Sequence, residues 1–164
     1  MNKLWTVLAA LLLFVACTAQ EPKADAVGPG DSITDFSVIM DDGTVLSSAG
    51  LAGSPSLIVF FNTTCADCRR TLPHVQTAYL NYGTKVRFVA ISRAQAREDV
   101  SQWWAANGMS VPFSAQEDDK VYKLFAQSRI PRIFISGADG KVLYAYDDNP
   151  CPDFAELDKV LGSL

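Results

Sequence analysis

The chain has 164 residues, a formal net charge of −4 and an apolar content of 49%. These values describe one ordinary domain that can bury a sizeable core, and they exclude an intrinsically disordered chain. With 14 basic against 18 acidic side chains, the sequence lacks the excess of Lys and Arg that phosphate binding requires, so no nucleic-acid partner is expected.

The first residues have the pattern of an export signal. Lys3 provides a positive charge, and residues 4–16 form an apolar stretch in which only Thr6 is polar. As a helix this stretch would span about 20 Å, which is shorter than the ~30 Å hydrocarbon core of a membrane. We therefore predict that residues 1–16 are a cleaved signal peptide, with an uncleaved anchor as the alternative.

Cys17 follows the apolar stretch directly. The four residues FVAC that end at Cys17 resemble a bacterial lipobox, in which the cysteine is lipidated and becomes the new N-terminus. The alternative is a plain secretory signal whose first mature residue happens to be Cys. We expect an exported protein, lipid-anchored to a bacterial membrane through Cys17 and facing the periplasm or the cell exterior. Residues 17–30 have the composition of a flexible tether.

The globular domain is predicted to span residues 31–164. It should begin with a β-hairpin of residues 36–40 and 44–46, joined by an Asp-Asp-Gly turn that supplies the required positive φ. Residues 56–62 form a continuous apolar run, which is typical of a strand buried on both faces. We expect this strand to be central in the sheet.

A helix should follow over residues 65–82, and residues 85–92 should form a second buried strand that pairs in parallel with the first. Apolar residues then recur at helical spacing over residues 96–107. Trp103 and Trp104 belong to this helix. We expect them to pack in the core and on the surface, with a ligand-binding platform as the less common alternative. A shorter helix is predicted around residues 121–125.

The C-terminal part predicts a second hairpin, in which strands of residues 133–135 and 142–146 flank an Ala-Asp-Gly turn. Apolar positions at helical spacing indicate a closing helix over residues 154–164. The order of elements implies an α/β fold, with a mixed central sheet, helices on both faces and an additional N-terminal hairpin.

The pattern CADC of residues 65–68 lies where a buried strand leads into a helix. A zinc site would need a second pair of ligands, but His74 is the only histidine and Cys151 stands alone, so no metal site is expected. At the start of a helix, unpaired N–H groups and the helix dipole stabilise a thiolate on the first cysteine. We therefore expect Cys65 to be the exposed nucleophile and Cys68 the deeper, resolving thiol.

Proline at position 131 opens the first strand of the second hairpin, either as a benign strand boundary or in a cis-proline loop. The segments FFNTTCADCRRTLP, SRIPRIFI and DGKV together resemble the TlpA/ResA branch of the thioredoxin-like superfamily. This resemblance covers roughly residues 36–164. It implies a thioredoxin-like fold without a cofactor, Cys65 as attacking thiol, Cys68 as resolving thiol, and Pro131 as a cis-proline facing them. Ile130 would offer its backbone to an extended substrate segment.

The sequence departs from this family at three positions near the motif. Thr64 replaces the usual Trp before the first cysteine, Thr71 stands where relatives in cytochrome maturation have Glu, and Val59 stands where thioredoxin has a buried Asp. The familiar proton-handling acids are therefore absent. A specific role in cytochrome c maturation is correspondingly not expected, and proton transfer must use other groups or water.

Two charged residues are expected to tune the site in opposite directions. Asp67 favours a helix N-terminus but disfavours a neighbouring thiolate, whereas Arg69 favours the thiolate because it lies four residues after Cys65. The simpler interpretation of Arg69 is a solvated surface charge. The sole histidine, His74, should point away from the thiols by helical spacing.

The first function hypothesis is a membrane-tethered thiol–disulfide oxidoreductase outside the cytoplasm, more specifically a disulfide reductase. Its partners would be protein disulfides or thiols and a membrane protein that donates electrons. The alternative is a metal or haem carrier of the same fold that uses the dithiol as a soft ligand. A peroxiredoxin-like peroxidase is disfavoured because the Pro-rich motif around its reactive cysteine is absent.

Cys151 is the thiol that remains once the other cysteines are assigned. If Pro131 faces the thiols, the strand that begins there runs away from the catalytic end of the sheet and residues 142–146 return to it. The loop that contains Cys151 should therefore border the active-site face. An auxiliary thiol and an incidental loop cysteine are both open at this point, because a disulfide would need Cα atoms within about 7 Å.

Overall fold

The computed structural model describes residues 26–164, and the predictions for the signal peptide and for lipid on Cys17 lie outside this range. Its main feature is a five-stranded mixed sheet with the strand order β5-β4-β3-β6-β7. A separate two-stranded sheet is formed by β1 and β2. The elements are β1 (Ser37–Ile39), β2 (Val45–Ser47), α1 (Ser48–Leu51), β3 (Ser56–Phe61), α2 (Ala66–Tyr82), β4 (Arg87–Ser92), α3 (Arg97–Ala106), β5 (Phe113–Ser114), α4 (Lys120–Phe125), β6 (Arg132–Ser136), β7 (Val142–Tyr146) and α5 (Phe154–Leu161).

Strand β3 is central, as the apolar run predicted, and every one of its residues is buried. It pairs in parallel with β4 and antiparallel with β6. The crossover through α2 allows β3 and β4 to pair in parallel, and the β6–β7 hairpin makes β7 antiparallel to β6. The predicted mixed sheet is confirmed.

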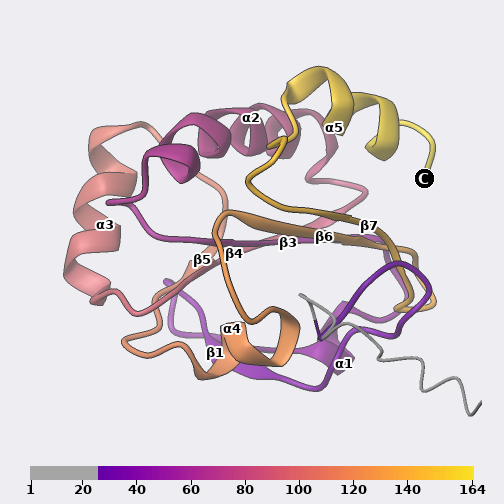
Figure 1. Cartoon of the computed structure of the whole chain (residues 1–164), viewed down its shortest axis with the longest axis horizontal. Coiled ribbons are helices and arrows are strands. Elements are labelled where there is room, and N and C mark those ends of the chain that lie inside the picture. The colour runs from indigo at the N-terminus through magenta and orange to yellow at the C-terminus, as the bar shows by residue number, and fades with distance from the viewer. Residues whose placement is uncertain (1–25) are drawn as a thin grey trace, which may run out of the picture.

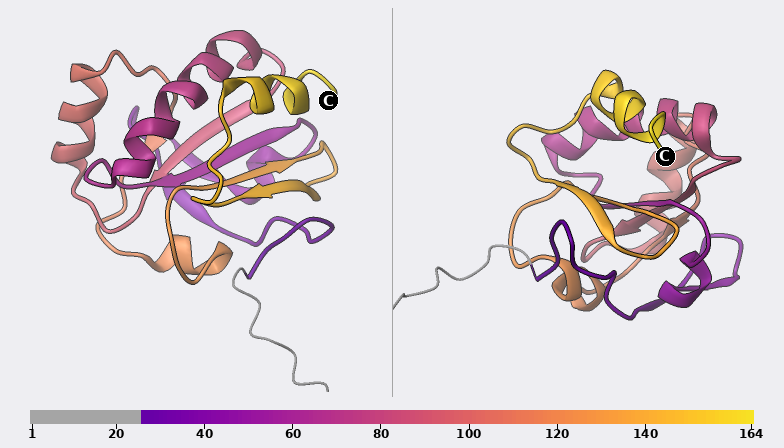
Figure 2. Two further views of the ribbon diagram at one scale, coloured as in Figure 1. Left: turned by 45° about the horizontal axis from the view of Figure 1, so that its top comes forward. Right: turned by 90° about the vertical axis from the view of Figure 1, so that its right-hand side faces the viewer.

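Helices cover both faces of the sheet (Figures 1 and 2). Helices α2, α3 and α5 pack on one face, over a core that includes the inward side chains of Leu57, Val59 and Phe61 from β3. The opposite face carries α1, α4 and the β1–β2 hairpin, over a core that includes Ile58 and Phe60. Alternate residues of β3 thus enter opposite cores, because successive strand side chains point to opposite faces.

The structure differs from the sequence predictions in three details. The short elements α1 and β5 were not predicted, because four and two residues are too few to show a hydrophobic period. The closing helix ends at Leu161 rather than at residue 164. The folded body also begins before Asp31, since Val27 is 3% exposed and its N–H donates to the carbonyl of Phe125.

Residues 27–30 are therefore packed against the body rather than part of a free tether. Gly30 also donates its N–H to the carbonyl of Val142 in the second hairpin. Within residues 26–164, no helix is long and apolar enough to cross a membrane.

Candidate active site

Cys65 lies at the N-cap of α2, immediately after the loop that leaves β3. Asn62 shapes this loop: its side-chain carbonyl accepts bonds from the N–H and hydroxyl of Thr64, and its backbone carbonyl accepts the N–H of Cys65 at 3.1 Å. The cysteine is half-buried. The turn thus places the Cys65 sulfur at the N-terminus of α2, where the free N–H groups of the helix favour negative charge.

Cys68 lies three residues further along α2 and is fully buried. Burial strongly raises the pKa of its thiol, while a backbone hydrogen bond from Asn62 lowers it and the neighbouring Cys65 raises it further. Cys68 is therefore held as a neutral thiol in the reduced protein. The expected asymmetry, with an accessible first cysteine and a protected second one, is confirmed.

The loop before β6 forms the wall opposite the cysteines. The Ile130–Pro131 bond is cis, as predicted, and Pro131 is buried. The carbonyl oxygen of Ile130 lies 3.5 Å from the sulfur of Cys65, which is a hydrogen-bonding distance for a thiol. The structure therefore brings the two motifs together, although 65 residues separate them in the chain.

A hydrogen-bond pair that the sequence analysis missed fixes the residue two positions before Cys65. The side chain of Gln95 accepts the N–H of Thr63 at 2.9 Å and donates back to the Thr63 hydroxyl. Both residues are buried. Gln95 lies in the loop after β4, and the parallel β3–β4 pairing brings the ends of both strands to one edge of the sheet. The available signal was a polar residue three positions after the end of a buried strand.

Arg69 has a role that neither sequence interpretation included. Its guanidinium Nε donates to the carbonyl of Thr63 at 2.6 Å, so the side chain braces the same loop from α2. Arg69 is exposed, as its interpretation as a surface charge implies, but this interpretation did not include the hydrogen bond from its Nε to the Thr63 backbone. Among residues 26–164, the Arg69 side chain makes no hydrogen bond to the Cys65 sulfur, so its expected effect on the thiolate stays a prediction.

Asp67 and Thr71 lie on the other side of α2. Asp67 forms an ion pair with Arg70, one turn along the helix. Thr71 is 1% exposed, and its hydroxyl makes no hydrogen bond within the described residues. In the same helix, Thr77 instead donates to the carbonyl of Pro73, the usual arrangement for a helical threonine. The Thr71 hydroxyl is thus a buried polar group without the backbone bond that Thr77 makes.

Cys151 lies beside Thr71, as the topology argument predicted for the catalytic end of the sheet. Burial raises the pKa of the Cys151 thiol, the Thr71 hydroxyl opposes this as a donor to the thiolate, and Asp67 raises it further. The Thr71 bond becomes available when Cys151 ionises. Cys151 is also close enough to Cys68 to raise the pKa of that thiol.

Ion pairs tie the Cys151 loop to the cis-proline loop. Arg129 contacts Asp148 at 3.2 Å, and the buried Arg132 contacts Asp147 at 3.6 Å. These contacts hold Cys151 near the cysteine pair. Within residues 26–164, no group of three or more His, Cys, Asp or Glu side chains is arranged to hold a metal ion.

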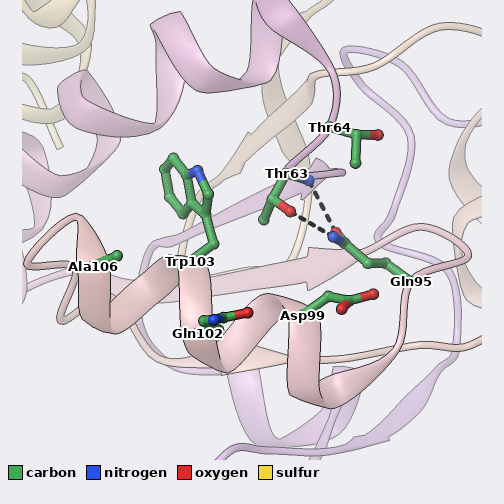
Figure 3. A pocket seen from close by; sticks show the side chains of 7 residues that line it. All are labelled: Thr63, Thr64, Gln95, Asp99, Gln102, Trp103 and Ala106. Carbon is green, nitrogen blue, oxygen red and sulfur yellow. Dashed lines mark hydrogen bonds between the residues drawn. The ribbon is translucent and has the colours of Figure 1, made fainter.

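A cavity of about 480 Å³ opens next to the loop that precedes Cys65 (Figure 3). Its lining comes from this loop, from the loop after β4 and from α3. The lining residues are Thr63, Thr64, Gln95, Asp99, Gln102, Trp103 and Ala106. The sequence analysis assigned Trp103 to packing; the structure places it half-buried, packed against the core and also facing this cavity.

Comparisons with known proteins agree with this fold. The family model described as Redoxin matches residues 28–161. The thiol-disulfide oxidoreductase ResA of Bacillus subtilis (strain 168) is 21% identical over 138 residues, which are 84% of this chain and 77% of the relative.

Solved structures show the same architecture. A thiol:disulfide interchange protein of the thioredoxin family from Chlorobium tepidum superposes with a TM-score of 0.70 at 23% identity, covering 85% of this chain and 98% of the other. A secreted Mycobacterium tuberculosis disulfide oxidoreductase homologous to E. coli DsbE gives a TM-score of 0.71 at 17% identity, covering 79% and 96%. The described body therefore has a thioredoxin-like fold.

Proposed function

The chain belongs to the Redoxin family and is a thiol–disulfide oxidoreductase of the thioredoxin type, and from this premise we propose that Cys65 and Cys68 form its redox-active pair. The observation that carries the proposal is the asymmetry of the two thiols. Cys65 is half-exposed at a helix N-terminus, whereas Cys68 is fully buried one turn away. Exchange requires one sulfur that attacks and one that is protected until the partner is bound.

In the proposed reaction, the Cys65 thiolate attacks one sulfur of a substrate disulfide. A Cys65–substrate disulfide forms, and the second substrate sulfur leaves with the bonding electron pair as a thiolate. Cys68 then gives its proton to the substrate thiolate released in the first step, or to water, and attacks the Cys65 sulfur, which releases the first substrate sulfur as a thiolate. The substrate gains two electrons and the protein becomes the Cys65–Cys68 disulfide.

The cis-proline loop is proposed as the platform for the substrate. Because the Ile130 carbonyl lies 3.5 Å from the Cys65 sulfur, an extended segment that pairs with this backbone would place its own cysteine within reach of attack. Protein disulfides and thiols are therefore the proposed substrates. Asp67 and Arg69 would tune the site only indirectly, since each has a protein partner of its own.

The reducing direction and the location belong to the same proposal. An exported reductase needs a source of electrons, and we assign this role to a membrane protein that reduces the Cys65–Cys68 disulfide. The export signal of residues 1–16 and lipid on Cys17 would keep the chain at the membrane. The similarity to a secreted oxidoreductase supports export.

Cys151 is proposed as an accessory thiol of this site. Its support is the position beside Thr71 and Cys68, in a loop that ion pairs hold against the cis-proline loop. A Cys151→Ser variant would then lower turnover in part. Unchanged turnover would make it an incidental loop cysteine.

Reduction of insulin disulfides by a metal-free preparation, with dithiothreitol as electron source, tests the function. We expect activity in the wild type, none above background in Cys65→Ser, and accumulation of a Cys65–substrate disulfide in Cys68→Ser. A wild type without activity, or a Cys65→Ser variant with full activity, would refute the redox pair. Labelling of the reduced protein by iodoacetamide should favour Cys65 over Cys68.

A further inference from the structure

The cavity beside the Cys65 loop faces three polar groups that have no partner in the described part of the chain. The Asp99 carboxylate, the Gln102 amide and the indole N–H of Trp103 make no hydrogen bond or ion pair there, whereas Thr63 and Gln95 satisfy each other. Figure 3 shows these side chains around the same hollow. Polar groups that are directed at one cavity beside an aromatic ring are typical of a binding site.

The cavity is close to the reacting sulfur, and its wall on that side is fixed. Thr64 lines it and is the residue directly before Cys65. Thr63 is held by Gln95 from one side and by Arg69 from the other. An extended peptide advances about 3.4 Å per residue. A side chain two or three residues from a bound substrate cysteine therefore lies about 7–10 Å along the chain from that cysteine and can enter a neighbouring cavity.

The lining has negative charge and no cation. Asp99 is exposed in the first turn of α3, and Trp103 lies four residues later on the same helix. Three arginines of the neighbouring segments have partners of their own: Arg69 donates to the carbonyl of Thr63, Arg97 donates to the carbonyl of Asp41, and Arg93 lies over the Tyr122 ring at 4.4 Å from its centroid. A carboxylate and an indole ring that line one cavity can both attract a guanidinium or ammonium group, the carboxylate through its charge and the ring through its quadrupole.

We propose that this cavity binds a lysine or arginine side chain of the substrate, two or three residues from the cysteine that Cys65 attacks. Asp99 pairs with the cationic head, and Trp103 contacts its alkyl stem and charge. The inference rests on the proposed thiol–disulfide exchange at Cys65 and adds a preference for basic segments around the substrate cysteine. An overall net charge of −4 favours the encounter with such segments.

The test uses short peptides in which one cysteine is disulfide-bonded to glutathione. Arginine, norleucine or glutamate is placed two or three residues before or after the cysteine, and kcat/KM is measured for the full chain with dithiothreitol as electron source. The arginine peptide should exceed the norleucine peptide by about fivefold and the glutamate peptide by more, because contacts of this kind contribute about 1 kcal/mol.

Variants separate the cavity from general charge effects. Asp99→Asn should remove most of the arginine preference and Trp103→Leu should reduce it. Glu98→Gln, which removes the same charge from the neighbouring residue of α3 outside this cavity, should keep it. Asp99 is exposed, so its variant tests the proposal even if Trp103→Leu folds poorly.

The outcomes distinguish the two proposals. Equal kcat/KM for all three peptides, with normal turnover, would overturn the cavity assignment and leave the oxidoreductase function intact. An equal loss of preference in Glu98→Gln and Asp99→Asn would also overturn it, since the overall charge would then be responsible. No turnover of any peptide by the wild type would overturn the exchange reaction and, with it, the cavity's role.

Discussion

Two loops border the Cys65 sulfur, and they are held in place by different interactions. The loop before Cys65 is fixed by the two hydrogen bonds between Thr63 and the buried Gln95 amide, and by the bond that the Arg69 guanidinium donates to the Thr63 carbonyl. The cis-proline loop is tied to the Cys151 loop by the ion pairs of Arg129 and Arg132 with two aspartates. The difference should appear in how each side responds to substitution and pH.

The largest effect is expected on the side of the buried amide. Gln95→Leu removes both bonds to Thr63 and leaves a buried N–H and a buried hydroxyl without partners, which should lower the free energy of unfolding by about 3 kcal/mol. Urea unfolding measures this loss. Gln127→Leu is the control, because its amide is exposed and donates only to the Lys123 carbonyl; its effect should stay within about 0.5 kcal/mol. If both variants lower the free energy of unfolding equally, the Thr63–Gln95 pair stabilises the fold no more than an exposed hydrogen bond does.

On the ionic side, the buried arginine should matter more than the exposed one. The Arg132 guanidinium is 4% exposed and also donates to the Ser128 carbonyl at 3.1 Å, so Arg132→Met should cost about 2 kcal/mol. Arg129 is 54% exposed, and Arg129→Met should cost less than about 0.5 kcal/mol. Urea unfolding of both variants at low and high salt tests the contrast. A larger loss for Arg129→Met would contradict it.

Cys68, which lies between the two loops, should make the stability of the reduced protein fall at alkaline pH. Burial raises the pKa of this thiol in the folded protein, whereas the unfolded chain ionises near pH 8.5. Above that pH the folded state binds more protons than the unfolded state, so stability falls as pH rises. The loss should reach about 1.4 kcal/mol at pH 9.5.

Unfolding in reducing buffer from pH 7 to pH 10 measures this slope. Cys68→Ala serves as the control, since it lacks the thiol and should show a shallower decline, whatever its own packing cost. Parallel pH profiles for the two proteins would argue against a buried neutral thiol.

The smallest effect concerns Thr71, which lies beneath Cys151. Its hydroxyl is buried without a hydrogen bond, so Thr71→Val should raise the free energy of unfolding by about 1 kcal/mol at neutral pH. Thr77→Val is the matched control in the same helix, because it removes the bond to Pro73 and should be neutral or slightly destabilising. A loss of stability in Thr71→Val would mean that the hydroxyl already stabilises its surroundings in the reduced protein.

The sequence by itself determined the elements with long, regular patterns. The buried run of β3 is typical of a strand inside a sheet because its side chains from Leu57 to Phe61 are all apolar, and the CADC motif after it lies where a helix begins. The glycine turns set both hairpins, since Gly43 and Gly140 adopt positive φ. Strand directions, together with the expectation from the family resemblance that Pro131 faces the thiols, then predicted that Cys151 lies at the end of the sheet that carries Cys65.

Only the tertiary structure decided which side chains complete the site. Gln95 contacts Thr63 because β3 and β4 are parallel and end at one edge, and the exposed Arg69 donates its Nε–H to the backbone of the same loop. Asp99 and Trp103 of α3 line the same cavity as Thr64. These contacts depend on single hydrogen bonds and shared cavity walls, which leave no periodic pattern in a sequence. Burial of whole helices and strands does leave such a pattern.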